Sequence, residues 1–188
     1  MNLSRRNLVM GALAISAAAG ASSGARAQSG SEILVAYLTR SGNTRVIAGQ
    51  IRRDLGADLF EIRASQPYPA DYEEMVAQAE RERVEGYEPP LAELVDDIAV
   101  YRTVFLGFPI WGMTAPSVIR SFLSKHDLTR KRIIPFITHG GYGVGNSLDV
   151  VTAHAPQAEV LEGFSLECDQ ERRTMETVRA WLADVQDV

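Results

Sequence analysis

The feature that most limits how this chain can fold is a set of five short apolar runs, rich in β-branched or aromatic residues. They lie at 33–38, 59–62, 104–108, 133–137 and 160–166. Several are too continuously apolar for one face to lie in water, which is typical of strands buried on both faces of a parallel sheet. Segments with the helical spacing of apolar residues lie between them. Strands that alternate with helices predict an α/β fold, with a doubly wound sheet of five parallel strands and helices on both faces.

Three helices are indicated by apolar stripes and by their end signals. The first has apolar residues at 46, 47, 51 and 55 on one face and is expected to end at Gly56. The second begins at Pro116. The last is marked by Met175, Val178 and Leu182.

The first 27 residues differ in character from the rest of the chain. Arg5 and Arg6 precede an uncharged stretch over 8–19, and Ala25-Arg26-Ala27 supplies a small-residue cleavage site. The segment Ser4-Arg5-Arg6-Asn7-Leu8-Val9 also resembles the twin-arginine export signal. This predicts a signal peptide over 1–27, a domain over 28–188 and a periplasmic location. An uncleaved anchor is the alternative, although the stretch is short and weakly apolar for a membrane span, so no stable membrane insertion of the mature chain is expected.

The size and net charge of the chain indicate one domain and disfavour one class of partner. The chain has 188 residues and is 46% hydrophobic, enough for one domain with a buried core. Without the three arginines of the first 27 residues, 16 basic and 24 acidic residues remain, a net charge of −8. This disfavours nucleic acid as a partner. Ten acidic residues gather over 71–97 and predict either a solvated helix face and loop or a docking face for a basic partner.

In an open α/β sheet, ligands bind beyond the carboxyl ends of the strands. The loop after the first predicted strand reads Thr39-Arg40-Ser41-Gly42-Asn43-Thr44. Its hydroxyls, its flexible glycine and the free N–H groups of a helix N-terminus would make a site for a phosphate. A capped turn that binds no ligand is the alternative.

Two further loops follow the next central strands. Pro109-Ile110-Trp111-Gly112 could lay the indole flat on an aromatic ring, or could instead form a hydrophobic plug over the sheet edge. Thr138-His139-Gly140-Gly141-Tyr142 is followed by Gly145, and these glycines permit close backbone approach while Tyr142 could cover the other side of a planar ligand. The role of His139 stays open between a satisfied loop residue and a functional group.

Through these three loops and Tyr68-Pro69-Ala70-Asp71-Tyr72, the mature chain resembles the flavodoxin-like family of short, single-domain FMN proteins, from Ile33 almost to its C-terminus. The resemblance implies the sheet order 2-1-3-4-5, the FMN phosphate on residues 39–44 and the flavin ring between the loops of Trp111 and Tyr142. It also implies a last strand without a long insertion, because the run 160–166 is uninterrupted. Many relatives carry a second aromatic residue or a Trp-Gly pair directly after the loop tryptophan, where this chain has Gly112-Met113. Relatives also often have Thr-Ser where this chain has Thr138-His139.

The resemblance further implies an FMN-binding redox protein that passes electrons to a partner protein or a small-molecule acceptor. An FMN-dependent NAD(P)H:quinone oxidoreductase or flavin reductase is the alternative, because nicotinamide can bind against an exposed flavin ring. A non-redox binding module on the same fold is a third class, which the tryptophan and glycine loops disfavour. No residue is assigned a catalytic role, and no metal site is predicted.

Overall fold

The computed structural model describes residues 30–167, 178 and 181–185. The predicted signal peptide, 1–27, lies outside them. The elements in chain order are β1 (Ile33–Tyr37), α1 (Asn43–Leu55), β2 (Asp58–Glu61), α2 (Tyr72–Glu85), the 3-10 helix η1 (Ile98–Val100), β3 (Thr103–Pro109), α3 (Ser117–Lys125), β4 (Arg132–His139), α4 (Ser147–His154), β5 (Glu159–Val160) and β6 (Phe164–Glu167).

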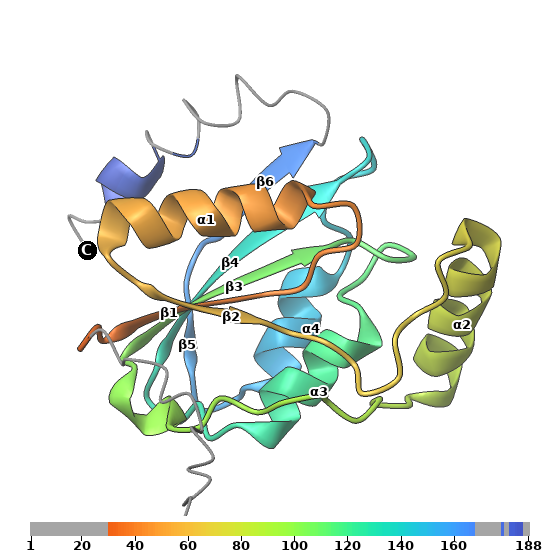
Figure 1. The fold of residues 1–188 in the computed structure, drawn as a ribbon, viewed down its shortest axis with the longest axis horizontal. Helices are drawn as coiled ribbons and strands as arrows, with labels where there is room; N and C mark the ends of the chain where they lie inside the picture. The colour runs from red at the N-terminus through yellow and green to blue at the C-terminus, as the bar shows by residue number, and fades with distance from the viewer. Residues whose placement is uncertain (1–29, 168–177, 179–180, 186–188) are drawn as a thin grey trace, which may run out of the picture.

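The sheet is parallel and has the strand order β2-β1-β3-β4-β5, with β6 also paired to β4. Helix α1 covers one face, whereas α3 and α4 cover the other, and α2 lies apart beyond the carboxyl ends of the strands (Figure 1). The predicted α/β fold and the order 2-1-3-4-5 are therefore confirmed. This order places the point where the chain changes direction between β1 and β3, which is where ligands of such sheets bind.

The run 160–166, expected as one strand, is two short strands. The N–H groups of Glu159 and Leu161 donate to the carbonyl oxygens of Lys131 and Ile133, so alternate residues of β4 face this edge. The next residue of β4 to face it is Pro135, which has no N–H to offer. Gly163 passes beside Pro135, and a Cβ there would lie 2.5 Å from the Pro135 carbonyl oxygen. The pairing is therefore interrupted at the proline and resumes in β6.

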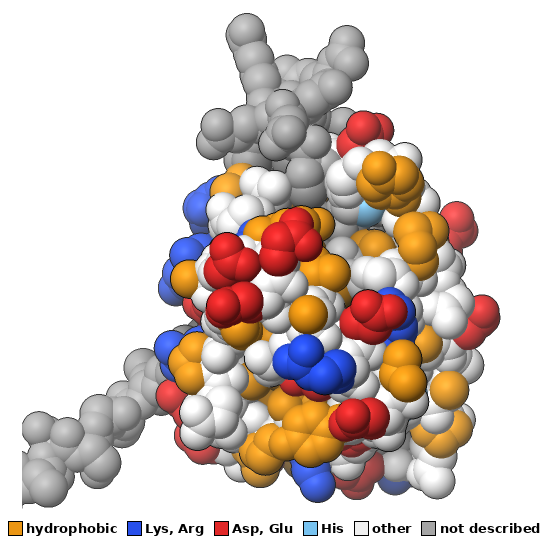
Figure 2. Space-filling view, turned by 90° about the vertical axis from the view of Figure 1, so that its right-hand side faces the viewer, with side chains coloured by type: hydrophobic (Ala, Val, Ile, Leu, Met, Phe, Trp, Pro, Cys, Tyr) orange, Lys and Arg blue, Asp and Glu red, His pale blue; other side chains and the backbone are white. Residues whose placement is uncertain are grey.

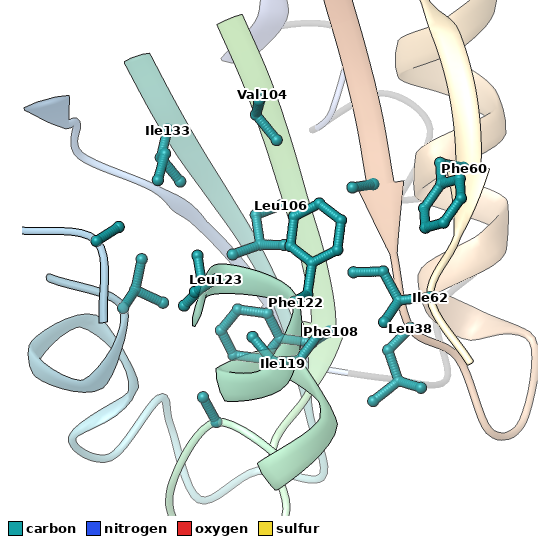
Figure 3. Close-up of a cluster of buried hydrophobic side chains, with 14 of the residues drawn as sticks. Leu38, Phe60, Ile62, Val104, Leu106, Phe108, Ile119, Phe122, Leu123 and Ile133 are labelled. Carbon is teal, nitrogen blue, oxygen red and sulfur yellow. The ribbon is translucent and has the colours of Figure 1, made fainter. Parts of the chain in front are cut away.

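Side chains of β3 alternate between two cores, one on each face of the sheet. Leu106 and Phe108 pack toward α3, against Phe122, in the cluster shown in Figure 3. Phe105 points the other way, into the cluster beneath α1 that includes Ile51. Burial on both faces explains why the sequence of this strand is continuously apolar.

The predicted helix ends are also found. Helix α1 stops at Gly56, whose φ of 60° is left-handed, and α3 begins directly after Pro116. Val178 and Leu182 of the last predicted helix are helical and buried, whereas Met175 lies outside the described residues. No helix in the described part of the chain has the length and apolar character needed to cross a membrane.

His126, just after α3, makes the stability of the fold depend on pH. Its Nε2 accepts the Val95 N–H at 3.0 Å, so its Nδ1 carries the proton and donates to the Phe122 carbonyl oxygen at 2.8 Å. This pairing requires the neutral ring, and burial lowers the pKa of His126 below its usual value.

We expect the free energy of unfolding to fall as the pH drops below about 6.5, because the unfolded chain then takes up a proton that the folded chain resists. The loss approaches about 1.4 kcal/mol for each unit by which the pKa of His126 is lowered. Urea unfolding at pH 7.5 and 5.5 measures it. His126→Gln should shrink the difference between the two pH values, and an unchanged difference would assign it to other groups.

Candidate functional site

Three loops predicted from separate parts of the sequence meet at the carboxyl edge of the sheet. The hydroxyl oxygens of Thr44, in α1, and Thr138, in β4, are 3.0 Å apart, and both side chains are buried. The Ile110 N–H donates to the Thr138 carbonyl oxygen at 2.9 Å, which joins the second loop to β4. The Asn146 N–H donates to the Met113 carbonyl oxygen at 3.2 Å and joins the second loop to the third.

The first loop ends in an open helix N-terminus. The Gly42 N–H donates to Thr39 Oγ1 at 3.1 Å, and Gly42 takes a left-handed φ of 98° as the N-cap of α1. The first helical bond runs from the Val46 N–H to the Gly42 carbonyl oxygen, so the N–H groups of residues 43–45 precede it and point out of the helix end. Apart from Gly42 and its two chain neighbours, no heavy atom of the described residues lies within 4 Å of where a Cβ of Gly42 would be. Free donors, open space and the positive end of the helix dipole together suit an anion.

The second loop contains a tight turn over residues 111–114, which we call the Trp turn. The Trp111 N–H donates to the Thr114 carbonyl oxygen at 3.1 Å, and Gly112 and Met113 have φ values of 60° and 63°. Positive φ at both central residues is the mark of a type I′ turn. The hydroxyl of Thr114 is buried without a hydrogen-bond partner among the described residues.

Six predicted site residues share one cleft of about 360 Å³ with α2. The loop side of this cleft consists of Arg40, Ser41, Pro109, Ile110, Trp111 and Gly112. The opposite side is one face of α2, formed by Tyr72, Met75, Val76, Ala79, Glu80 and Arg83. The volume lies within the range of small-molecule sites, roughly 300–1,000 Å³. We call this the α2 cleft.

The α2 wall was not predicted as part of the site, although the sequence carries a signal for it. Positions 72, 76, 79 and 83 recur at helical spacing, and Tyr72 and Val76 remain 59% and 38% exposed where they line the cleft. Most acidic residues of 71–97 are exposed, as a solvated face requires. Figure 2 views the side on which α2 lies and shows acidic side chains there in small groups among hydrophobic and basic side chains.

A second cleft of about 520 Å³ adjoins the first and shares Arg40 and Trp111 with it. It extends over Leu38, Thr39, residues 61–64 and residues 67–70. Arg40 joins its two sides, because its Nη2 donates to the Ala70 carbonyl oxygen at 3.2 Å and its guanidinium lies 5.3 Å from the centre of the Tyr72 ring. The predicted loop residue Arg40 therefore contacts the segment before α2.

The third predicted loop does not line either of these two clefts. Tyr142 is 80% exposed, and its role in covering a ligand stays a prediction. The Gly141 N–H donates to Nδ1 of His139 at 3.1 Å, so this histidine stabilises the turn over Gly140 and Gly141. A Cβ on Gly145 would overlap the Met113 carbonyl, which shows how closely this loop packs on the Trp turn.

An anion-suited helix N-terminus and an aromatic turn, side by side at the switch point of a parallel sheet, define a ligand-binding protein of the doubly wound α/β class. The chain belongs to the flavodoxin family: the family model described as Flavodoxin matches residues 32–185.

Solved structures agree with this family. A protein assigned as a flavoprotein from Bacteroides eggerthii DSM 20697 is 34% identical, with a TM-score of 0.71, over 83% of this chain and 98% of that one. A second such protein, from Bacteroides uniformis ATCC 8492, is 27% identical with the same TM-score, over 80% of this chain and 97% of that one. A flavoprotein from Lactobacillus acidophilus NCFM, solved in complex with FMN, is 20% identical with a TM-score of 0.63, over 71% of this chain and 91% of that one; it shares the fold. No curated protein matches the chain.

Proposed function

We propose that this protein binds FMN and transfers electrons through it, to a redox partner protein or a small-molecule acceptor. The observation that carries the proposal is the open N-terminus of α1, with free space above Gly42, beside the aromatic Trp turn. FMN combines a terminal phosphate with a planar ring, so it needs an anion site and an aromatic surface close together. The FMN complex of the Lactobacillus acidophilus flavoprotein supports the same ligand for this fold.

The donor set fits the phosphate of FMN. Thr39 uses its oxygen to accept the Gly42 N–H, so its own O–H is left to donate, and the Ser41 side chain is exposed. With the N–H groups of residues 43–45 they supply several donors to one anion, and charge-assisted bonds of this kind are strong. Trp111 would contact the ring. Bound FMN would supply one- and two-electron oxidation and reduction, while the protein binds and orients it.

An FMN-dependent NAD(P)H:quinone oxidoreductase or flavin reductase is the second candidate. It is favoured by the two clefts that meet at Trp111, since a reductase must admit a second small molecule beside the cofactor. The visible spectrum of the FMN-loaded protein separates the two functions. Bleaching by NADPH and recovery with a quinone favour the reductase, whereas reduction only by another protein favours the carrier.

We predict that Ser41→Ala weakens FMN binding by about tenfold and leaves riboflavin binding unchanged. One charge-assisted hydrogen bond to the phosphate is lost, worth roughly 1.5–3 kcal/mol, and riboflavin has no phosphate. Titrating the apoprotein with each flavin and following flavin fluorescence gives both affinities. Thr44→Ala is a less direct probe, because it also removes the partner of the Thr138 hydroxyl. Equal affinity of the wild-type protein for FMN and riboflavin would overturn the phosphate site.

Export to the periplasm by the twin-arginine route is part of the same proposal. It rests on Arg5 and Arg6, on the uncharged stretch after them and on the small residues at 25–27. This route carries folded proteins, which agrees with a cofactor that binds in the cytoplasm before export.

A further inference from the structure

Two consecutive residues of α2 hold the Trp turn. The first contact is made by Arg83, whose Nη1 donates to the Gly112 carbonyl oxygen at 3.1 Å. The guanidinium fills the space that a Cβ of Gly112 would occupy, so glycine at this position is what admits it. Oε1 of Glu80 lies 3.7 Å from Nη2 of Arg83 and helps to orient the guanidinium. Arg83 thereby fixes the backbone of the turn.

The second contact begins at Glu82, the buried member of the acidic stretch, which is 5% exposed. Its carboxylate accepts the Tyr68 hydroxyl at 2.6 Å and the Gln78 amide at 2.9 Å. Burial and the neighbouring Glu82 raise the pKa of the Tyr68 hydroxyl, which therefore stays protonated and donates. Tyr68 in turn meets the Trp111 ring edge-on, with centroids 4.8 Å apart and an interplanar angle of 80°. Glu82 thus acts on the indole through Tyr68.

Neighbouring residues of an α-helix point about 100° apart, so Glu82 and Arg83 reach different parts of the turn. One contact ends on the Trp111 ring and the other on the Gly112 carbonyl. The turn needs such support, because Met113 holds a left-handed φ of 63° that most residues avoid. A turn with a strained central residue keeps one conformation only when its surroundings favour it.

We propose that Glu82 and Arg83 form a clamp by which α2 positions Trp111 at the ligand site. Neither residue is required to touch a ligand, and Tyr68 is the third member because it transmits the contact of Glu82. The effect of the clamp on a flavin rests on the proposed function, whereas its effect on Trp111 is a property of the protein alone. The effect of the clamp on Trp111 and its effect on FMN binding are therefore measured separately.

The first readout is the accessibility of Trp111 in the apoprotein. The chain has two tryptophans, so Trp181→Phe leaves Trp111 as the single reporter. In that background, Arg83→Ala and Tyr68→Phe are expected to raise acrylamide quenching of Trp111 about twofold, because a turn released from α2 is more open to solvent. If Trp181→Phe fails to fold, Trp181 is kept and each variant is also made with Trp111→Phe. The difference between the two fluorescence spectra then gives the emission of Trp111 and its quenching.

Matched controls separate the effect of breaking the clamp from the general effect of removing a charge or a hydroxyl group. Arg81→Ala removes an exposed arginine of the same helix that does not line the α2 cleft, and Tyr101→Phe removes a buried phenol hydroxyl that donates to Asp58, at the opposite end of the sheet from the Trp turn. Neither control should change quenching. Arg83→Lys, which keeps a donor and the charge, should fall between wild type and Arg83→Ala. If Arg83→Ala and Tyr68→Phe leave quenching as unchanged as their controls do, the proposed clamp does not exist.

The second readout is FMN affinity of the same variants in the full protein. Arg83→Ala and Tyr68→Phe should each weaken FMN binding about threefold to tenfold, as expected when a positioning contact worth one hydrogen bond is lost. Unchanged affinity, together with increased quenching, would overturn the link between the clamp and the ligand. Absence of FMN binding by the wild-type protein would overturn the proposed function and leave the quenching result standing.

Discussion

Replacing Gly107 by alanine is expected to lower the free energy of unfolding by about 1–3 kcal/mol, the usual cost of overpacking a dense core. Gly107 lies inside β3, paired to Tyr37 of β1 on one side and to Phe136 of β4 on the other. A Cβ at this position would overlap the Phe136 ring. That ring is fully buried beneath α1, so it can move only if its neighbours in this cluster also shift.

Urea unfolding of the variant measures the effect, and Gly140→Ala is the matched control. Gly140 has no positive φ, and no heavy atom lies within 4 Å of where its Cβ would be. Phe136→Ala combined with Gly107→Ala should cost less than the sum of the two single variants, because the overlap then disappears. Equal stability of the Gly107 and Gly140 variants would show that the core adjusts to the extra methyl group.

The sequence predicted the sheet well because burial on both faces leaves a local signal. Each central strand needs apolar residues at successive positions, and β3 shows why, with Leu106 on one side and Phe105 on the other. Helix ends left local signals as well, in Gly56 and Pro116. These features depend on a few neighbouring residues, so a single sequence contains them.

Features that depend on distant partners were missed or stayed open. The division of 160–166 into two strands follows from Pro135, about 25 residues earlier, and becomes visible only when the pairing with β4 is known. Among the acidic residues of 71–97, nothing local marks Glu82 as buried, since its partner Tyr68 lies 14 residues before it. Helix α2 is a different case, because residues 72, 76, 79 and 83 do share one helix face in the sequence, but the sequence does not show that this face lies opposite the Trp turn.

The site itself was predicted as loops rather than as contacts. The sequence placed hydroxyls in the first and third loops, but the bond between Thr44 and Thr138 joins residues 94 positions apart. The sequence left His139 open between a satisfied loop residue and a functional group. In the structure its ring accepts a hydrogen bond from the Gly141 N–H. Positions that require glycine are the hardest to predict from the sequence, because the atoms that a side chain would meet there belong to other loops.

Gly145→Ala is expected to weaken FMN binding by about tenfold or more, because it forces the third loop away from the Trp turn. Gly145 has a φ of 54°, and a Cβ there would overlap the carbonyl of Met113, one of the two central residues of the Trp turn. Backbone atoms cannot swing aside as a side chain does, so one of the two loops must shift. The adjacent bond from the Asn146 N–H to the Met113 carbonyl oxygen would be lost in the same movement.

Gly143→Ala is the control that separates this overlap from backbone strain. Gly143 lies in the same loop with a φ of 76°, and nothing lies within 4 Å of where its Cβ would be. Both variants therefore carry a similar left-handed penalty, about 1–2 kcal/mol, and only Gly145→Ala adds a clash between loops. FMN titrations of the two variants should differ by the cost of separating the loops. If both lose the same affinity, contact between the Trp turn and the third loop has no part in binding, and the ligand is held by the N-terminus of α1 and the α2 cleft alone.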